Sequence, residues 1–145
     1  MQVREIMRGK SKGQLKYAKV TDTVEEIACQ LRLENVGAVP IRDAHGDIVG
    51  MIAERDVIRA IADFGPRALA MNCTEIVARD LETCRPQDTM ARVARQMTDR
   101  RVRHLLVTSD DEITGIVSIG DVVKQRLEEL ELETSVLRDM AVARS

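Results

Sequence analysis

Two short stretches, GMIAERD at residues 50–56 and GIVSIGD at residues 115–121, carry the same pattern and decide the fold. Each has a glycine, two apolar β-formers, a small residue and an aspartate at fixed offsets, and each precedes a helix-like segment. A strand that ends on a small residue and opens a helix near a carboxylate presents free helix N–H groups and a fixed acceptor in one turn. This combination suits a nucleotide, because phosphate can meet the N–H groups and the ribose diol can meet the carboxylate.

The segments around these two stretches, which we call the signature turns, repeat as well. Residues 5–7 (EIM) match residues 75–77 (EIV), and a helical pattern opens on a threonine in both copies, at Thr23 and Thr89. Thr23 has Glu26 three residues on, which is the pattern of a capping box. Apolar side chains in both helices follow the spacing i, i+3, i+4 and i+7, which predicts one buried face for each. The second face lies 66 residues after the first: Val24, Ile27, Ala28 and Leu31, then Met90, Val93, Ala94 and Met97.

A β-rich run follows each helix, at residues 36–41 and 102–107. In the first copy, residues 48–53 form the second strand of a predicted hairpin. Pro40 has no N–H, which argues against a central strand that is hydrogen-bonded along both edges. A further helical pattern over residues 56–62 stops at a Gly-Pro pair. The predicted order of elements is therefore β-α-β-β-α, written twice.

A duplicated unit of about 60 residues is too short for a solenoid. We predict a mixed α/β (α+β) fold with repeat 1 at residues 5–65, a linker at 66–74, repeat 2 at 75–132 and a C-terminal helical tail at 133–145. Each repeat alone would bury too little surface, so we expect the two to pack sheet to sheet around a pseudo-twofold axis. The signature turns would then share one cleft between the repeats, where small molecules usually bind.

The composition excludes several classes of partner. Hydrophobic residues make up 44% of the chain, but it has one Phe, one Tyr and no Trp, so it lacks the aromatic platforms on which single-stranded nucleic acid stacks. With 22 basic and 24 acidic residues it also lacks an overall basic field, and we expect no nucleic-acid partner. No stretch approaches about 18 uninterrupted apolar residues. We therefore expect a soluble cytoplasmic protein with no membrane partner.

The spacing of the cysteines argues against a metal site, and the absence of catalytic motifs argues against an enzyme. Cys29, Cys73 and Cys84 are an odd number and lack the spacing of a zinc site or a CxxC motif, so we expect reduced thiols and no metal site. The sequence has no nucleophile elbow, no HExxH and no Walker-type phosphate loop. We expect no catalytic residues and predict that the protein is not an enzyme.

The helical pattern after the second signature turn continues for a long way. Its apolar positions follow a 4-3-4-3-4 spacing with charged residues between them, which is typical of a short coiled-coil seam. The seam consists of Val123, Leu127, Leu130, Thr134, Leu137 and Ala141. The alternative is a helix that packs on its own domain. We favour a homodimer contact, because a helix that extends past the repeat has little of its own domain left to cover.

The paired units, the VGAVPI run at residues 36–41, the RVRHL run at 101–105 and the Gly-apolar-x-[Ser/Thr]-x-x-Asp turn together resemble tandem CBS domains, named for cystathionine β-synthase. The resemblance covers about residues 5–130 and is to small stand-alone bacterial proteins made of one CBS pair. It implies a disc-like pair called a Bateman module, often dimeric. Such a module binds an adenosine-containing ligand such as AMP, ADP, ATP, NAD or S-adenosylmethionine, and serves as a sensor that regulates a protein partner.

The resemblance also implies roles for the signature turns. Asp56 and Asp121 would bind the ribose hydroxyls, and Ser118 would contact phosphate. Ala53 stands where the first copy would have the matching hydroxyl, so that copy departs from the pattern and lacks the phosphate donor. We therefore predict that the Asp121 site fills with nucleotide before the Asp56 site.

Further binding residues follow from the same resemblance. The segments just before each first helix would line the adenine pockets with main-chain groups and apolar side chains, through Val20, Thr21, Cys84, Arg85 and Pro86. By similarity to the γ subunit of AMP-activated kinase, Arg103 and His104 would reach phosphate across the cleft. The matching Gly37 and Ala38 bring backbone close but no charge.

Simpler roles exist for the same residues. Asp56 and Asp121 would act as helix N-caps, and His104 would be a structural histidine. At the level of function, one alternative to a nucleotide sensor is a protein-interaction or scaffold module whose clefts are degenerate, which Ala53 and the long C-terminal helix favour. Another is a metal- or redox-responsive regulator that uses the cysteines, which their spacing disfavours.

Overall fold

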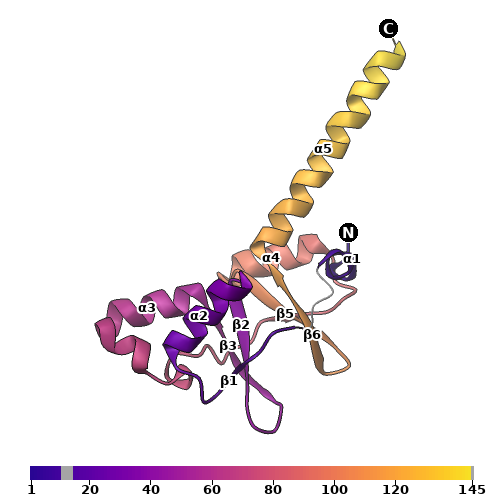
Figure 1. The fold of residues 1–145 in the computed structure, drawn as a ribbon. Coiled ribbons are helices and arrows are strands. Elements are labelled where there is room, and N and C mark those ends of the chain that lie inside the picture. Colours follow the sequence, from indigo (N-terminus) through magenta and orange to yellow (C-terminus); the bar gives the residue numbers. More distant parts are fainter. Residues whose placement is uncertain (11–14, 145) are drawn as a thin grey trace. The chain divides into compact units, whose positions relative to one another are not determined.

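The structure is a computed structural model that describes residues 1–10 and 15–144, and it contains two compact units (Figure 1). The first-repeat unit consists of Gln14–Leu81. The second-repeat unit combines Met1–Gly13 with Glu82–Ser145. Each unit has its own hydrophobic core and its own three-stranded sheet.

The first-repeat unit holds a sheet in the order β1-β2-β3, with β1 and β2 parallel and β2 and β3 antiparallel. Its elements are β1 (Ala18–Lys19), α2 (Val24–Glu34), β2 (Ala38–Arg42), β3 (Ile48–Ala53), α3 (Glu54–Phe64) and the 3₁₀ helices η1 (Gly65–Ala70) and η2 (Cys73–Glu75). The linker predicted at residues 66–74 is therefore folded, and Cys73 is fully buried in the core of this unit.

The second-repeat unit has the same topology, with the sheet order β4-β5-β6 and the same strand directions. Its elements are α1 (Val3–Gly9), β4 (Thr83–Cys84), α4 (Met90–Arg100), β5 (His104–Ser109), β6 (Glu112–Ser118) and α5 (Ile119–Arg144). The two sets of elements confirm the duplicated β-α-β-β-α order and the mixed α/β fold. The packing of the two sheets against each other stays a prediction.

The first helix of each copy forms as its sequence pattern indicates. Thr23 caps α2 in a full capping box with Glu26, and Thr89 caps α4 by accepting the Arg92 N–H at 3.1 Å. The predicted faces are the buried ones, because three of the four predicted positions in each helix have almost no exposed surface. These are Val24, Ile27 and Leu31 in α2, and Met90, Val93 and Met97 in α4. Helix periodicity therefore predicted the buried face of both helices.

Pro40 lies in β2, which is the central strand of its sheet, so the expectation that this run is not a central strand is wrong. Pro40 is paired with Met51, but the Met51 N–H and carbonyl both bond to Ala78, at 3.0 and 3.1 Å. On the other edge, β1 pairs only with Ile41 and Arg42. The strand is central, yet no ladder bond needs a donor at the proline.

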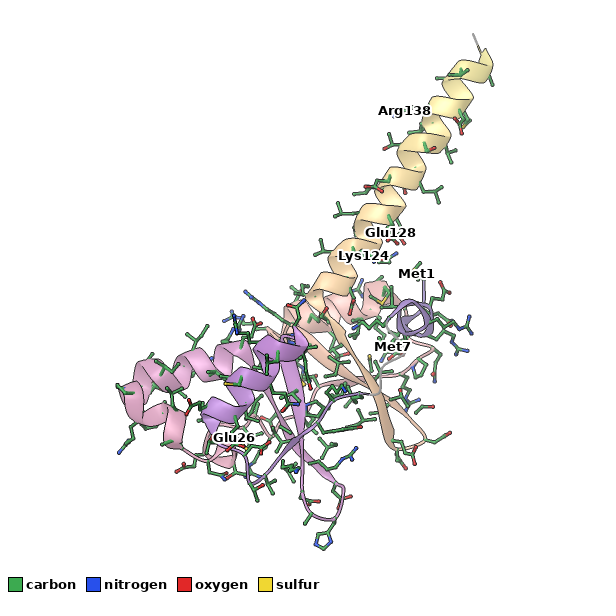
Figure 2. All side chains as sticks on the ribbon, viewed as in Figure 1. Met1, Met7, Glu26, Lys124, Glu128 and Arg138 are labelled. Atoms are coloured by element: carbon green, nitrogen blue, oxygen red, sulfur yellow. The ribbon has the colours of Figure 1, made fainter. Side chains whose placement is uncertain are left out.

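Each unit also contains a segment from outside its own repeat. The residues before repeat 1 belong to the second-repeat unit, and those before repeat 2 belong to the first-repeat unit. In the second-repeat unit, the Val3 N–H donates to the Asp88 carbonyl at 2.9 Å. In the first-repeat unit, the Cys73 N–H donates to the Asp22 carbonyl, also at 2.9 Å. Residues 71–78 therefore complete the first unit, and the N-terminal segment with α1 completes the second by matching contacts. Figure 2 labels Met1 and Met7 in this N-terminal segment.

The last element, α5, is a single helix of 26 residues that runs well past the other elements of its unit (Figure 1). It packs on the unit through its first turns, where Gln125 is only 6% exposed. Among the residues that the structure describes, no helix has both the length and the apolar composition of a membrane span.

Candidate functional site

The second signature turn forms a complete capping box at the start of α5. Ser118 is the N-cap, and its N–H donates to Asp121 Oδ2 at 2.8 Å, while the Asp121 N–H donates to Ser118 Oγ at 3.2 Å. The Ser118 hydroxyl also donates to the same carboxylate oxygen at 3.1 Å. The expectation that Asp121 is itself the N-cap is wrong, because α5 begins at Ile119 and the aspartate is the third residue of the helix. The hydroxyl and the carboxylate predicted for the ligand are thus side by side.

The first signature turn forms half of this arrangement. Asp56 Oδ2 accepts the Ala53 N–H at 2.8 Å, so this aspartate too is the third residue of its helix and not the N-cap. Ala53 makes no side-chain cap hydrogen bond, because it has no hydroxyl. The helix N–H groups that Ser118 satisfies in the second turn therefore have no side-chain acceptor at Ala53.

Lys10 joins the second signature turn from the end of α1. Its Nζ lies 2.6 Å from Asp121 Oδ2 and donates to the Ile116 carbonyl at 2.6 Å. Lys10 was not among the site residues predicted from the sequence. The sequence signal that could have pointed to this position is the internal repeat. Met7 matches Val77, and Lys10 and Asp80 each follow three residues later. The turn with the serine therefore has a cation, and the turn with the alanine has an exposed acid at the matching sequence position.

The fold brings Arg103 and His104 to the second signature turn. His104 opens β5 and pairs with Ser118 at the end of β6. The Arg103 carbonyl accepts the Ile119 N–H at 2.8 Å, and the Arg103 side chain is exposed. One end of this sheet therefore gathers the Ser118 hydroxyl, the Asp121 carboxylate and the Lys10 ammonium at a helix N-terminus, with the backbone of Arg103 and His104 beside them.

The matching end of the first sheet gathers far fewer functional groups. Ala38 pairs with Ala53, and the Gly37 carbonyl accepts the Glu54 N–H at 3.0 Å. Gly37 and Ala38 therefore bring backbone and no charge to the Asp56 turn, and their part in a ligand site stays a prediction.

The residues predicted to line the adenine pockets lie at the opposite end of each sheet. Cys84 pairs with Val107, three residues along β5 from His104, which is about 10 Å at the usual rise of a strand. Arg85 and Pro86 follow Cys84 away from the signature turn of their own unit. The fold therefore does not bring this group to the ribose carboxylate of the same unit.

Val20 and Thr21 occupy the corresponding place in the first-repeat unit. The Val20 N–H donates to the Arg42 carbonyl at 3.2 Å, at the end of β2 away from Ala38. Sequence order alone does not reveal this, because it depends on β1 running parallel to β2.

A cavity of about 550 Å³ lies beside Val20 and Thr21. The Arg42 guanidinium carbon is 3.6 Å from the centre of the Tyr17 ring, so a cation and an aromatic face meet in its wall. Its volume is in the range of small-molecule sites. The lining residues are Leu15, Lys16, Tyr17, Ala18, Lys19, Val20, Thr21, Arg42, Asp43 and Ala44.

The leading glycine of each signature turn has a packing role. A Cβ at Gly50 would lie 2.6 Å from the Ala78 carbonyl oxygen, and a Cβ at Gly115 would lie 2.7 Å from the sulfur of Met7. The segment that completes each unit is thus packed directly against this glycine. Close packing accounts for the shared glycine without a ligand.

The cysteines provide no reactive cluster. Burial, with a smaller contribution from Asp88, raises the pKa of Cys84 to about 11, and burial with Asp22 raises the pKa of Cys73. Cys29 is exposed. Within residues 1–10 and 15–144, no three His, Cys, Asp or Glu side chains are placed to hold a metal ion. A thiolate-based regulator is therefore disfavoured by burial as well as by spacing.

Comparisons with known proteins match both copies. The family model for the CBS domain matches residues 3–63 and 73–128. The mitochondrial CBS domain-containing protein CBSX3 of Arabidopsis thaliana is 31% identical over 129 residues, which are 84% of this chain and 63% of the plant protein. The chain thus spans less than two thirds of that relative.

Solved structures match over most of the chain. The CBS-domain protein ATU1752 of Agrobacterium tumefaciens is 30% identical with a TM-score of 0.82, covering 86% of this chain and 92% of that one. The CBS domain pair of protein MJ0100 is 25% identical with a TM-score of 0.77, covering 89% of this chain and 98% of that one. That pair was crystallised with 5′-methylthioadenosine and S-adenosyl-L-methionine.

Proposed function

Since the chain belongs to the CBS-domain family and carries two CBS repeats, we propose that it is a non-catalytic regulatory module that binds an adenosine-containing ligand. The observation that carries the proposal is the second signature turn, where the side chains of Ser118, Asp121 and Lys10 meet at the N-terminus of α5. The ligands of the MJ0100 pair support the adenosine class. AMP, ADP, ATP, NAD and S-adenosylmethionine are the candidates.

Each group at this turn has a role in the proposal. The hydrogen bonds of Ser118 and Lys10 go to Oδ2 of Asp121, so Oδ1 is available to a ribose hydroxyl. The Ser118 hydroxyl, the Lys10 ammonium and the helix N-terminus supply donors and positive charge for phosphate. Arg103 and His104 add a guanidinium and an imidazole at the edge of the same turn.

We propose unequal occupancy of the two turns. Ala53 removes the hydroxyl donor from the Asp56 turn, and Asp80 occupies the sequence position in the repeat that matches Lys10. A phosphate-bearing ligand therefore meets positive charge at one turn and an acid at the other. For a ligand without phosphate, such as S-adenosylmethionine, the difference between the turns should be smaller.

The proposal includes a homodimer through which the ligand signals to a protein partner. Such a signal requires that the ligand bind two states of the dimer unequally. The second candidate function, a scaffold module with degenerate clefts, is favoured by Ala53 and by the exposed seam of α5.

A thermal-shift screen with AMP, ADP, ATP, NAD and S-adenosylmethionine tests the proposal. A ligand at about 100 times its dissociation constant adds about 2.7 kcal/mol to the free energy of unfolding, which is easily detected. Isothermal titration of the best ligand into Asp121→Asn then tests the ribose role, because asparagine still accepts the Ser118 N–H but is a weaker partner for a diol. The matched control is Asp56→Asn. No shift with any ligand would favour the scaffold, and unchanged affinity in Asp121→Asn would refute the ribose assignment.

A further inference from the structure

The seam of α5 is exposed along its whole length. Val123, Leu127, Leu130 and Leu137 are 51%, 53%, 43% and 66% exposed. We infer that this seam pairs with α5 of a second copy of this chain, as a parallel, in-register, two-stranded coiled coil. The inference rests on the proposed function only for the presence of a homodimer, and it adds the orientation and the contacts.

The seam does not compete with the contacts that α5 makes to its own unit. The packed face carries Val122, Gln125 and Glu129, whose Gln125 and Glu129 side chains are hydrogen-bonded to each other. A helix turns about 100° per residue, so Val123 and Leu127 point about 100° or more away from this face. A second helix can therefore lie along the seam from Val123 onward without displacing the unit. Figure 2 shows Lys124 near the base of α5 and Arg138 far along it.

A second apolar stripe on α5 is a weaker candidate for pairing. It consists of Leu132, Val136 and Met140. Continued towards the N-terminus at the same spacing, it meets Glu129 and the buried Gln125, which already face the unit. The exposed apolar part of this stripe extends only from Leu132 to Met140, whereas the seam runs from Val123 to Ala141 with Thr134 as its one polar position.

The middle of the seam has the shape that a coiled-coil contact needs. Numbered as heptads, Val123, Leu130 and Leu137 are d positions, and Leu127, Thr134 and Ala141 are a positions. A shallow hollow of about 380 Å³ is lined by Leu127, Leu130, Glu131, Thr134, Ser135 and Arg138. Its first four lining residues are successive a, d, e and a positions, which form the hole that receives a d side chain of a parallel partner. Leu130 of a second copy would fill it.

The charges beside the seam select the parallel orientation. In a parallel pair, a g residue faces the e residue five positions on in the partner. Arg126 then faces Glu131, and Glu133 faces Arg138, twice each in the dimer. All these contacts join opposite charges.

An antiparallel pair with the same core would place like charges together. Its e positions face e positions and its g positions face g positions across a centre near residue 132. Glu131 would face Glu131, Glu133 would face Glu133, and Lys124 would face Arg138. The sequence that pairs Arg126 with Glu131 and Glu133 with Arg138 in parallel thus opposes the antiparallel form.

Disulfide trapping tests the register directly. In a Cys29→Ser background, Leu130→Cys should form an intermolecular disulfide under mild oxidation, because d positions meet their own copies in a parallel pair. The control Leu132→Cys, on the other side of the helix, should stay reduced. In an equal mixture of Leu130→Cys and Thr134→Cys, a mixed disulfide formed in place of the 130–130 product would indicate an antiparallel pair and overturn the inference.

Charge reversal at Glu133 and Arg138 tests the orientation without a cross-link. Analytical ultracentrifugation should show dimer dissociation constants about tenfold higher for Glu133→Arg and for Arg138→Glu, and near the wild-type value for the double variant. Glu128→Arg, the same charge change on the outer side of the seam, should have little effect. Tighter dimers for Arg138→Glu alone would indicate the antiparallel form, and a monomeric or trimeric wild-type chain would also overturn the inference.

The nucleotide-binding proposal and the coiled-coil inference can be tested independently of each other. Ligand-induced thermal shifts in the Glu133→Arg variant, compared with the wild-type chain, report the binding site alone. Retained shifts without the disulfide at position 130 would reject the coiled coil and keep the nucleotide module. The disulfide without any ligand shift would do the reverse.

Discussion

The two signature turns start their helices in the same way but offer a ligand different chemistry. In both, an aspartate at the third helical position accepts the N–H of the last strand residue. Only the second adds the Ser118 hydroxyl and the Lys10 ammonium. The comparison teaches that the aspartate is sufficiently explained by helix initiation, whereas the hydroxyl and the lysine are the features that distinguish a candidate ligand site.

The largest expected difference between the two turns concerns their glycines. Gly50→Ala should lower the free energy of unfolding by about 3 kcal/mol, because the new Cβ meets the backbone carbonyl of Ala78. Gly115→Ala should cost about 1 kcal/mol, since it meets the flexible Met7 side chain. Urea unfolding of both variants checks the order. Equal losses would mean that the two segments pack in equivalent ways.

A second effect belongs to the second-repeat unit and depends on pH. The folded state raises the pKa of Cys84 from 9.0 to about 11, so this thiol stays protonated when the unfolded chain has already ionised. The free energy of unfolding that this raised pKa contributes is fully present below pH 9. It falls by roughly 2 kcal/mol as the pH rises to 11. Denaturant unfolding between pH 8 and pH 11 should show a smaller decline in Cys84→Ala than in the wild-type chain. Parallel declines would contradict the assignment.

Removal of Lys10 tests how the lysine affects the affinity of the second signature turn for its ligand. Lys10→Ala should weaken the binding of a phosphate-bearing adenosine ligand about tenfold, because it removes a cation from the turn. Binding of S-adenosylmethionine should change less. Isothermal titration measures both, with the exposed neighbour Arg8→Ala as the control. Tighter binding in Lys10→Ala would instead identify the lysine as a competitor of the ribose for Asp121.

The smallest expected effect comes from exchanging the caps. Ala53→Ser should stabilise the chain by about 1 kcal/mol by completing the first capping box, and Ser118→Ala should destabilise it by a similar amount. Thermal or urea unfolding measures both. If Ala53→Ser also brings a second equivalent of nucleotide into the titration, the missing hydroxyl is what separates the turns. If Ala53→Ser stabilises the chain without added binding, the difference in nucleotide binding between the turns depends on Lys10 and Asp80 instead.

The sequence was most informative where the determining interactions are local. Helix faces such as Val24, Ile27 and Leu31 and the capping box of Thr23 depend on spacings of three or four residues, and they formed as predicted. Pro40 was misjudged because its neighbour Met51 bonds to Ala78, which lies outside the hairpin.

The parts of the site that could not be predicted depend on distant chain segments. Lys10 reaches Asp121 only because α1 packs in the second-repeat unit. Parallel pairing of β1 and β4 places Val20 and Cys84 at the ends of their sheets away from the signature turns of their own units, and their role in an adenine pocket stays a prediction. The spacing of apolar residues does not reveal whether two strands pair in parallel or antiparallel.

The exchange of leading segments between the units has a consequence for any attempt to divide the chain. A cut at residues 66–74 would give two halves, each carrying the piece that completes the other, since Met1–Gly13 belongs with Glu82–Ser145. We expect neither half to fold well alone and the co-expressed halves to restore each other by complementation. By the same logic, removal of the N-terminal segment from Met1 through α1 should loosen hydrogen exchange at Met90, whose N–H donates to the Met1 carbonyl, before it disturbs the strand that follows the segment in the sequence.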